Sequence, residues 1–478
     1  MNDATVTPVP EILALGAAEV GRRLLAGEFS STELITALLE RIDRINPTVN
    51  AVRETLYDQA LSSAHAADYR LKSGSPCGPF EGVPITVKDN IDVAGTATTQ
   101  GVAAFAGRIA DTDAPSVANL RQAGAIPIGR TNMPDFALRW HTDSGLCGPT
   151  LNPWDADLTP GGSSGGEAVS LATGMSLLGL GTDLGGSLRW PSQCAGTSAL
   201  RPTLGRIPQA SSIEPTASSM SLQLLDVHGP MARRIEDLRL ALRIMSAPDP
   251  GDPWHCPVPP SYVPATLRRV HVLHELAGVD IDPSVQKAMQ RAAAALQTHG
   301  YELVDDTPPG INDAAAAWAQ LMTSDARRIW PALEQVASAG GKQFMETMFD
   351  LIPAIGHDDY AQLFVTRHKL ARAWGEHQNR VPLVLAPIFA GPAFLAGSDL
   401  AGPCAAARIV EGLRATLVVN LLGLPSVAVP VGLVNHLPQA VQLIGPRFGE
   451  EICLQAAEVI EAAVERITPI NPRVRRNP

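Results

Sequence analysis

The chain has 478 residues, of which 45% are hydrophobic and 18% charged, a balance typical of a globular enzyme and unlike that of a disordered chain. Its formal charge of -11 leaves no basic surface for a phosphate backbone, and no apolar stretch has the length of a membrane span. The six cysteines show neither a C-x-x-C pair nor metal-ligand spacing, and the first residues do not resemble a secretion signal, so we expect a cytoplasmic protein with reduced thiols.

The first part of the chain predicts two helices and then a strand that contains a lysine. Apolar residues recur at helical spacing over 11–25 and 32–45, and Ser30 begins a capping-box pattern before the second helix. The segment GVPITVKD at 82–89 is short and rich in β-branched residues, which predicts a strand. Lys88 lies in this strand among apolar neighbours.

A glycine- and serine-rich run, TPGGSSGG at 159–166, stands between segments that both predict ordered structure. The stretch 116–132 predicts a helix, a stop at Gly124 and a strand, and 167–183 predicts a helix of small residues followed by an apolar strand. Composition alone would favour a flexible linker, but linkers are more often flanked by polar, turn-rich sequence. We therefore expect the run to join ordered elements.

The second half of the chain continues the alternation of strands and helices. A proline-rich excursion at 249–264 precedes a strand in RRVHVLHEL, and 283–375 has a helical pattern. Buried strands are predicted at 381–389 and 424–433, and a closing helix at 450–464. This interleaving favours an α/β fold in which a large mixed β-sheet core is covered on both faces by α-helices.

Two serine segments place a hydroxyl among glycines, GGSSGG at 161–166 and GTDLGGSLRWP at 181–191. Glycines let backbone N–H groups approach a substrate closely. Consecutive N–H groups of the second segment suit an oxyanion hole for acyl transfer, and they belong to Leu184, Gly185, Gly186 and Ser187. In the same segment we interpret Asp183 and Arg189 as an ion pair that fixes the loop.

A serine nucleophile needs a base that accepts its proton. None of the eleven histidines lies in a recognisable motif, and His271 and His274 would point to opposite faces of a strand. Burial of Lys88 disfavours its charged form, and a neutral amine can accept a proton. Lys88 is therefore the candidate base, although a lysine at a strand end is more often an ordinary surface residue.

Several motifs occur in an order that resembles the amidase signature family of serine hydrolases. They are GVPITVKDNIDV, GRTNMPDF, TPGGSSGGEAV, GTDLGGSLRWP and RPTLGR, and later NLLGLPSVAVPVG and LPQAVQLIG. The resemblance spans about residues 10–465. It implies one amidase signature domain over 1–478, with a core at about 10–250 and 376–465 and a variable, mostly helical substrate-pocket region at about 251–375.

The resemblance implies a Ser-cisSer-Lys triad and an acyl-enzyme mechanism that needs neither a metal nor an organic cofactor. Ser187 matches the family's nucleophile, and Lys88 matches its base. Ser163 matches the serine that follows a cis peptide bond and relays protons between them. Ser164 is expected to help orient Lys88.

Three other interpretations remain. GGSSG also satisfies the G-x-S-x-G pattern of α/β-hydrolases, which would make Ser163 the nucleophile and leave Lys88 unexplained. The A subunit of glutamyl-tRNA amidotransferase, which works in a complex and transfers ammonia to a charged tRNA, resembles this sequence in the same core motifs, but Trp190 stands where a polar glutamine is expected in that subunit. The third interpretation is a binding module that keeps the fold without turnover and would bind an amide without hydrolysing it.

The substrate implied by the resemblance is a small molecule with a linear C–N bond: an aryl or alkyl amide first, and a carbamate, urethane or ester next. An apolar ring beside the nucleophile favours an apolar or aromatic group. Large apolar side chains would form an adaptable cleft, and those predicted to line it are Trp190, Met322, Trp330 and Phe389. Nucleic acids and membranes are not expected as partners, and a homodimer is compatible with this assignment.

Overall fold

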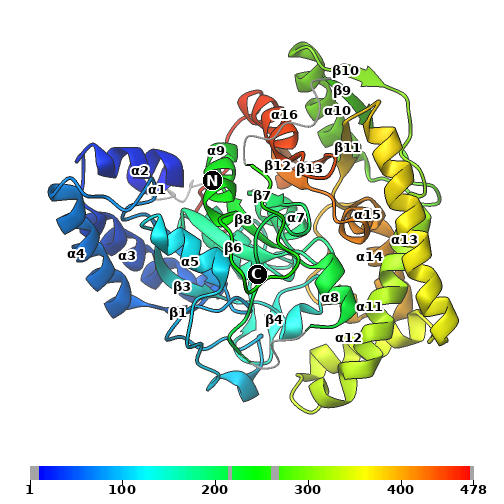
Figure 1. The fold of residues 1–478 in the computed structure, drawn as a ribbon, viewed down its shortest axis with the longest axis horizontal. Coiled ribbons are helices and arrows are strands. Elements are labelled where there is room, and N and C mark those ends of the chain that lie inside the picture. Colours follow the sequence, from blue (N-terminus) through cyan, green and yellow to red (C-terminus); the bar gives the residue numbers. More distant parts are fainter. Residues whose placement is uncertain (1–9, 214–217, 260–267, 474–478) are drawn as a thin grey trace, which may run out of the picture.

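The computed structural model describes residues 10–213, 218–259 and 268–473, and its centre is one mixed β-sheet (Figure 1). Within these residues the sheet has eleven strands. In sheet order they are β1 (Val52–Thr55), β3 (Ile126–Thr131), β2 (Pro84–Lys88), β6 (Leu178–Thr182), β8 (His228–Ala232), β7 (Ser198–Arg201), β12 (Ser426–Val434), β13 (Leu437–Ile444), β11 (Leu383–Pro387), β9 (Arg269–Val272) and β10 (Glu302–Val304). A separate ribbon pairs β4 (Asp143–Ser144) with β5 (Gly148–Pro149). The predicted α/β fold with a large mixed sheet is confirmed.

Helices flank this sheet, with the N-terminal ones on the left of Figure 1 and a group from the predicted variable region on the right. The left group is α1 (Glu11–Ala14), α2 (Ala17–Leu25), α3 (Ser31–Val49) and α4 (Tyr57–Lys72), and the right group is α11 (Ile311–Leu333), α12 (Ala339–Leu351) and α13 (His357–Gln378). The others are α5 (Pro115–Gln122), α6 (Gly165–Ala172), α7 (Arg189–Ala195), α8 (Met220–Leu225), α9 (Ile235–Met245), α10 (Pro283–Thr298), α14 (Pro403–Gly412), α15 (Arg414–Leu422) and α16 (Glu450–Ala462), with short 3-10 turns at Ala103–Phe105, Asp135–Ala137 and Ser398–Leu400.

The neighbouring parallel strands β2 and β6 each end in a polar residue, Lys88 and Thr182, at the same edge of the sheet. β2 pairs in parallel with β3 and β6, and β6 pairs antiparallel with β8. All residues of β2, β3 and β6 are buried, as expected where helices cover a parallel sheet. Lys88 and Thr182 are the last residues of β2 and β6. They therefore stand at the carboxyl ends of parallel strands, where α/β sheets place their ligand sites.

The first predicted helix, 11–25, is two helices, α1 and α2, separated at Gly16. The backbone of Gly16 is extended, and the Ala18 N–H at the start of α2 donates to Asp237 Oδ1 at 2.8 Å. A carboxylate that accepts from the first turn stabilises a helix start. Such a partner, far away in the sequence, leaves no local signal. The capping box predicted at Ser30 is confirmed at the start of α3.

The glycine- and serine-rich run at 159–166 is buried along its whole length. Gly161 has a φ of 81°, and a Cβ there would lie 2.5 Å from the Cα of Pro191. A Cβ at Gly162 would lie 2.6 Å from the Arg139 carbonyl oxygen. Only glycine fits such close backbone approaches. The prediction that this run joins ordered elements is therefore confirmed.

Two sequence predictions concern residues that the structure does not describe. The first is that the start of the chain does not resemble a secretion signal, which involves residues 1–9. The second is the end of the proline-rich excursion, at 260–264. Across the described ranges, no helix combines the length and the apolarity that crossing a bilayer requires.

Candidate active site

The Lys88 side chain is fully buried at the end of β2 and contacts two hydroxyl groups. Its Nζ donates to Ser163 Oγ at 2.7 Å and to Thr182 Oγ1 at 2.8 Å. Asn90 Nδ2 donates to the same Thr182 oxygen at 3.1 Å. Ser164 Oγ donates to the Thr182 carbonyl oxygen at 3.4 Å instead of contacting Lys88. The hydroxyl that orients Lys88 beside Ser163 is therefore that of Thr182, which corrects the prediction for Ser164.

The two serine segments, which directly precede α6 and α7, contact each other. The peptide bond between Gly162 and Ser163 is cis, as the resemblance implies. The Ser164 N–H donates to the Ser187 carbonyl oxygen at 3.3 Å, so the loop that carries the predicted nucleophile lies against the Ser163 turn. The Ser187 residue is 6% exposed, which leaves a small opening towards solvent. The structure thus places the loop that carries Ser187 against the turn in which Ser163 Oγ contacts Lys88 Nζ.

A buried carboxylate, that of Asp183, holds the loop around Ser187. Its Oδ1 accepts from the Gly186 N–H at 2.9 Å, and its Oδ2 accepts from the Leu188 N–H at 3.2 Å. Arg189 forms the predicted ion pair with Asp183 at 3.0 Å, with both side chains fully buried. Burial opposes ionisation of Asp183, but Arg189 and Arg201 hold the pKa of its carboxyl below the ordinary value. The predicted Asp183–Arg189 pair is confirmed as the anchor of this loop.

The four backbone groups predicted as an oxyanion hole have different partners. The Gly186 N–H is directed at Asp183 Oδ1, because this carboxylate lies three residues earlier in the same turn. It is therefore not available to a substrate. The N–H groups of Leu184, Gly185 and Ser187 donate to no protein acceptor in the described part of the chain. These three remain the candidate donors.

The electrostatic surroundings of Lys88 favour a proton acceptor. Burial lowers the pKa of its ammonium group to about 7. Negative charge on nearby carboxyl groups opposes this shift, in decreasing order on Asp226, Asp183 and Glu167. Burial also raises the pKa of Asp226 to about 7, and its carboxyl interacts with the Lys88 ammonium. Burial therefore favours the neutral amine of Lys88, which is the form that a general base requires.

The topology of the sheet explains how Asp226 comes near Lys88. Asp226 lies two residues before His228, which is the direct partner of Thr182 across β6 and β8. Side chains alternate along extended backbone, so Asp226 emerges on the same face as His228 and Thr182. Its Oδ1 is buried and has no hydrogen-bond partner among the described residues. A carboxyl oxygen without a partner is thus held beside the Lys88 cluster.

The residues predicted to line the apolar cleft lie in two places. Trp190, at the second position of α7, is wholly buried; its ring stacks on Phe394 at 5.4 Å and lies 4.8 Å from the ring of Phe389. Phe389 itself is half-buried. Met322 and Trp330 both belong to α11, where Met322 is half-buried and Trp330 is buried. The Trp190 ring therefore supports Phe389 and Phe394 from behind and is not itself an accessible wall.

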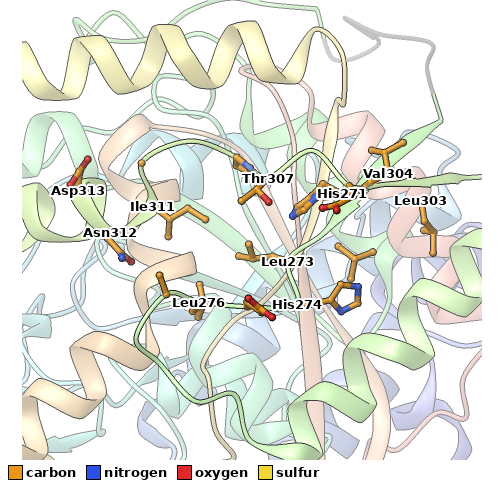
Figure 2. Close-up of a pocket in the computed structure, with 16 residues that line it drawn as sticks. His271, Leu273, His274, Leu276, Leu303, Val304, Thr307, Ile311, Asn312 and Asp313 are labelled. Atoms are coloured by element: carbon orange, nitrogen blue, oxygen red, sulfur yellow. Dashed lines mark hydrogen bonds between the residues drawn. The ribbon is translucent and has the colours of Figure 1, made fainter.

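An open cavity of about 960 Å³ lies away from these groups, at the ends of β9 and β10 and the start of α11 (Figure 2). Its lining includes His271, His274, Asp305 and Asp313, and no residue of the Lys88 cluster contributes to it. Over residues 10–213, 218–259 and 268–473, no group of three or more His, Cys, Asp or Glu side chains is arranged to hold a metal ion. The cavity is therefore separate from the site of the predicted triad.

The sequence analysis missed five residues of this site, which are Thr182, Asn90, Asp226, Trp140 and Trp318. Thr182 closes an apolar strand directly before Asp183, a position that could have revealed it. The indole N–H groups of Trp140 and Trp318 donate to carbonyl oxygens of Gly185 and Leu184, over sequence separations of 45 and 134 residues. No local pattern connects residues so far apart.

Comparison with known proteins places the chain in a family. The family model for Amidase matches residues 33–454. The chain is 38% identical over 451 residues to an indoleacetamide hydrolase of Bradyrhizobium diazoefficiens, which covers 93% of this chain and 86% of the relative. It is 32% identical over 478 aligned positions to the A chain of the glutamyl-tRNA(Gln) amidotransferase of Symbiobacterium thermophilum, with 93% and 95% covered. Among solved structures, fatty acid amide hydrolase superposes with a TM-score of 0.85 at 23% identity, over 96% of this chain and 88% of that chain.

These matches identify the family of the chain and the class of its reaction. The interpretation of GGSSG as the nucleophile elbow of an α/β-hydrolase fold is wrong, because the amidase family model matches residues 33–454 and spans both segments. The separate roles of Ser163 and Ser187 stay predictions. The indoleacetamide hydrolase match extends over 93% of this chain, and the fold of fatty acid amide hydrolase superposes over 96% of it. The chain belongs to the amidase family and is a hydrolase of amide carbon–nitrogen bonds.

Proposed function

We propose that this amidase hydrolyses the primary amides of arylacetic acids, such as indole-3-acetamide, through an acyl-enzyme on Ser187. The observation that carries the mechanism is the 2.7 Å contact between Lys88 Nζ and Ser163 Oγ, next to a turn that is hydrogen-bonded to Ser187. The 38% identity to an indoleacetamide hydrolase supports the substrate class. Small carbamates and aryl esters belong to the proposal as additional substrates.

In the acylation half-reaction, Ser187 Oγ attacks the amide carbon. Its proton passes to Ser163 Oγ, while the Ser163 proton passes to the neutral amine of Lys88. The carbonyl oxygen becomes an oxyanion, which accepts hydrogen bonds from backbone N–H groups of the loop before Ser187. The C–N bond then breaks, and Lys88 returns a proton through Ser163 to the leaving nitrogen. Ammonia departs and the acyl group remains on Ser187.

Deacylation repeats the same relay with water as the nucleophile. Ser163 takes a proton from the attacking water and gives its own to Lys88. The oxyanion forms again in the same loop, and the bond between Ser187 Oγ and the acyl carbon breaks. The proton then returns from Lys88 through Ser163 to Ser187 Oγ, so that the carboxylic acid leaves and the resting enzyme is restored.

Aromatic side chains near the nucleophile loop support an aromatic acyl group. Trp140 lies 6.2 Å from Trp318 and 6.0 Å from Phe344, measured between ring centroids. Trp190, whose Nε1 donates to the Trp140 carbonyl oxygen at 2.9 Å, is covered by the rings of Phe389 and Phe394. Such rings pack well against a flat aromatic substrate. They offer no charged partner to the ammonium group of an amino-acid amide.

The substrate proposal is tested by ammonia release from a panel of amides. We expect kcat/KM for indole-3-acetamide and phenylacetamide to exceed that for phenylalaninamide and glutamine by at least about tenfold, because a buried ammonium group without a partner is strongly disfavoured. The Ser187→Ala variant is the control for contaminating amidases. Equal or faster turnover of the charged amino-acid amides would contradict the proposal.

The amidotransferase role is the second function that the relatives suggest, at 32% identity. Its activity would require glutamine as the nitrogen donor and partner proteins. The buried Trp190 at the position where a polar glutamine is expected argues against it. Glutamine hydrolysis faster than arylacetamide hydrolysis, in the panel described above, would favour the amidotransferase.

Because burial lowers the pKa of Lys88 to about 7, we expect kcat/KM to rise with pH through the neutral range. Asp226 favours the charged ammonium, so Asp226→Asn should lower the pKa of Lys88 and move the acid limb of the kcat/KM profile to lower pH. The profile is measured from pH 5 to 9 on phenylacetamide. A limb that stays in place or moves to higher pH would show that Asp226 does not act on the base. Asp305→Asn, in the cavity of Figure 2, is the matched control and should leave the limb unchanged.

A further inference from the structure

Two tryptophan side chains hold consecutive carbonyl groups of the loop before Ser187. Trp318 Nε1 donates to the Leu184 carbonyl oxygen at 2.9 Å, and Trp140 Nε1 donates to the Gly185 carbonyl oxygen at 2.9 Å. The two residues are only 6% and 5% exposed, respectively. Trp318 comes from α11, inside the region that the sequence assigns to the substrate pocket. A helix of the variable region thus contacts the catalytic loop directly.

The peptide group between Gly185 and Gly186 is fixed at both ends. In a planar trans peptide, the carbonyl oxygen and the following N–H point in opposite directions. The Gly185 carbonyl accepts from Trp140, and the Gly186 N–H donates to Asp183 Oδ1 at 2.9 Å. This plane therefore has a protein partner on each side. Neither the carbonyl nor the N–H of this peptide group is available to bind a substrate.

The preceding peptide group, between Leu184 and Gly185, is fixed at one end only. Its carbonyl accepts from Trp318, while the Gly185 N–H donates to no protein acceptor among the described residues. The bond from Trp318 sets the direction of this N–H, which must point away from the indole. A hydrogen bond to the carbonyl also polarises the peptide and makes its N–H a stronger donor.

The contact between Trp318 and the loop is close. A Cβ at Gly185 would lie 2.5 Å from Trp318 Cζ2, so the ring packs directly on the glycine backbone. Glycine permits this approach and any larger residue would displace the ring or the loop. The indole thus restrains the Leu184–Gly185 plane by packing as well as by its hydrogen bond.

We propose that Trp318 is a positioning residue that orients and strengthens the Gly185 N–H as a donor to the oxyanion. Trp318 does not touch the reacting atoms and acts through the peptide group between Leu184 and Gly185. The inference rests on the proposed function, because it takes Ser187 as the nucleophile beside this loop. It adds that the variable helix α11 sets the geometry of catalysis as well as the shape of the pocket.

The test is Trp318→Phe, which keeps an aromatic ring and removes the indole N–H. We expect kcat on phenylacetamide to fall about tenfold with KM within about twofold of wild type, because the lost interaction acts in the transition state. The rate constant for inactivation by a fluorophosphonate should fall by a similar factor, since its phosphoryl oxygen occupies the same donor site. The amount of label bound at completion measures the fraction of folded enzyme, so a poorly folding variant is still readable.

Trp374→Phe is the matched control. Trp374 Nε1 donates to the Pro309 carbonyl oxygen at 2.7 Å in a buried position on α13, so the substitution removes the same kind of bond away from the loop. It should leave kcat, KM and the inactivation rate within about twofold of wild type. An unchanged kcat and inactivation rate in Trp318→Phe would overturn the proposal, as would a rise in KM alone.

Failure of the proposed substrate would look different. Wild-type enzyme that is labelled at Ser187 but hydrolyses no arylacetamide would refute the substrate class. The comparison of inactivation rates between Trp318→Phe and Trp374→Phe would then still decide the role of Trp318, because the fluorophosphonate needs no particular amide. Absence of label on Ser187 in the wild type would instead refute the nucleophile and, with it, this inference.

Discussion

Replacing Ser187 by alanine is expected to lower kcat for arylacetamide hydrolysis by about 10,000-fold or more, since the variant lacks the oxygen that we propose as the one that forms the acyl-enzyme. The residual rate would come from substrate binding and the backbone donors alone. Asp183 holds this loop through the backbone N–H groups of Gly186 and Leu188, which the substitution leaves in place, so the melting temperature should stay close to that of wild type. Ammonia release and thermal denaturation on the same preparation measure both effects.

Fluorophosphonate labelling followed by peptide mapping separates the two serine segments. Wild type should carry the label on Ser187, and Ser187→Ala should carry none. Ser192→Ala, in the following helix α7, is the control and should retain both the label and the activity. Label on Ser163, together with hydrolysis that survives in Ser187→Ala, would reverse the roles of the two serines.

The parts of the fold that follow local rules were predictable from the sequence. The capping box at Ser30, the strand that ends at Lys88 and the buried run at 159–166 all carry their signals within a few residues. The Asp183–Arg189 pair was predictable for the same reason, because both residues lie in one short turn. The motifs that carry the proposed triad are also contiguous segments.

Features that depend on distant parts of the chain were not predictable. Asp226 acts beside Lys88 only because β8 pairs with β6, and the sequence does not specify that pairing. Trp190 follows Ser187 by three residues, yet α7 turns its ring into the core against Phe394. The helical pattern of 283–375 places Trp318 in a helix, and only the packing of α11 on the loop reveals its contact with Leu184.

Lys88→Met is expected to separate catalysis from stability. Methionine has a similar length and no charge, so it fills the same buried space at the end of β2 without the desolvation of an ammonium group. Two hydrogen bonds are lost, but Thr182 Oγ1 keeps the bond from Asn90 Nδ2. We therefore expect a melting temperature equal to or above that of wild type. A catalytic group held against its own preference in the core is a known source of lost stability.

The same variant should lower kcat by about 1,000-fold, because a thioether cannot accept the proton that Ser163 passes on. Ser187 would then react slowly with the fluorophosphonate as well, since its hydroxyl is no longer activated. Lys287→Met, at an exposed position of α10, is the control and should change neither rate. If Lys88→Met kept more than about a tenth of the wild-type kcat, Lys88 would not be the base. If Lys88→Met lost activity only in proportion to a fall in its melting temperature, the role of Lys88 would be structural. The lowered pKa of its ammonium group would then have no part in the reaction.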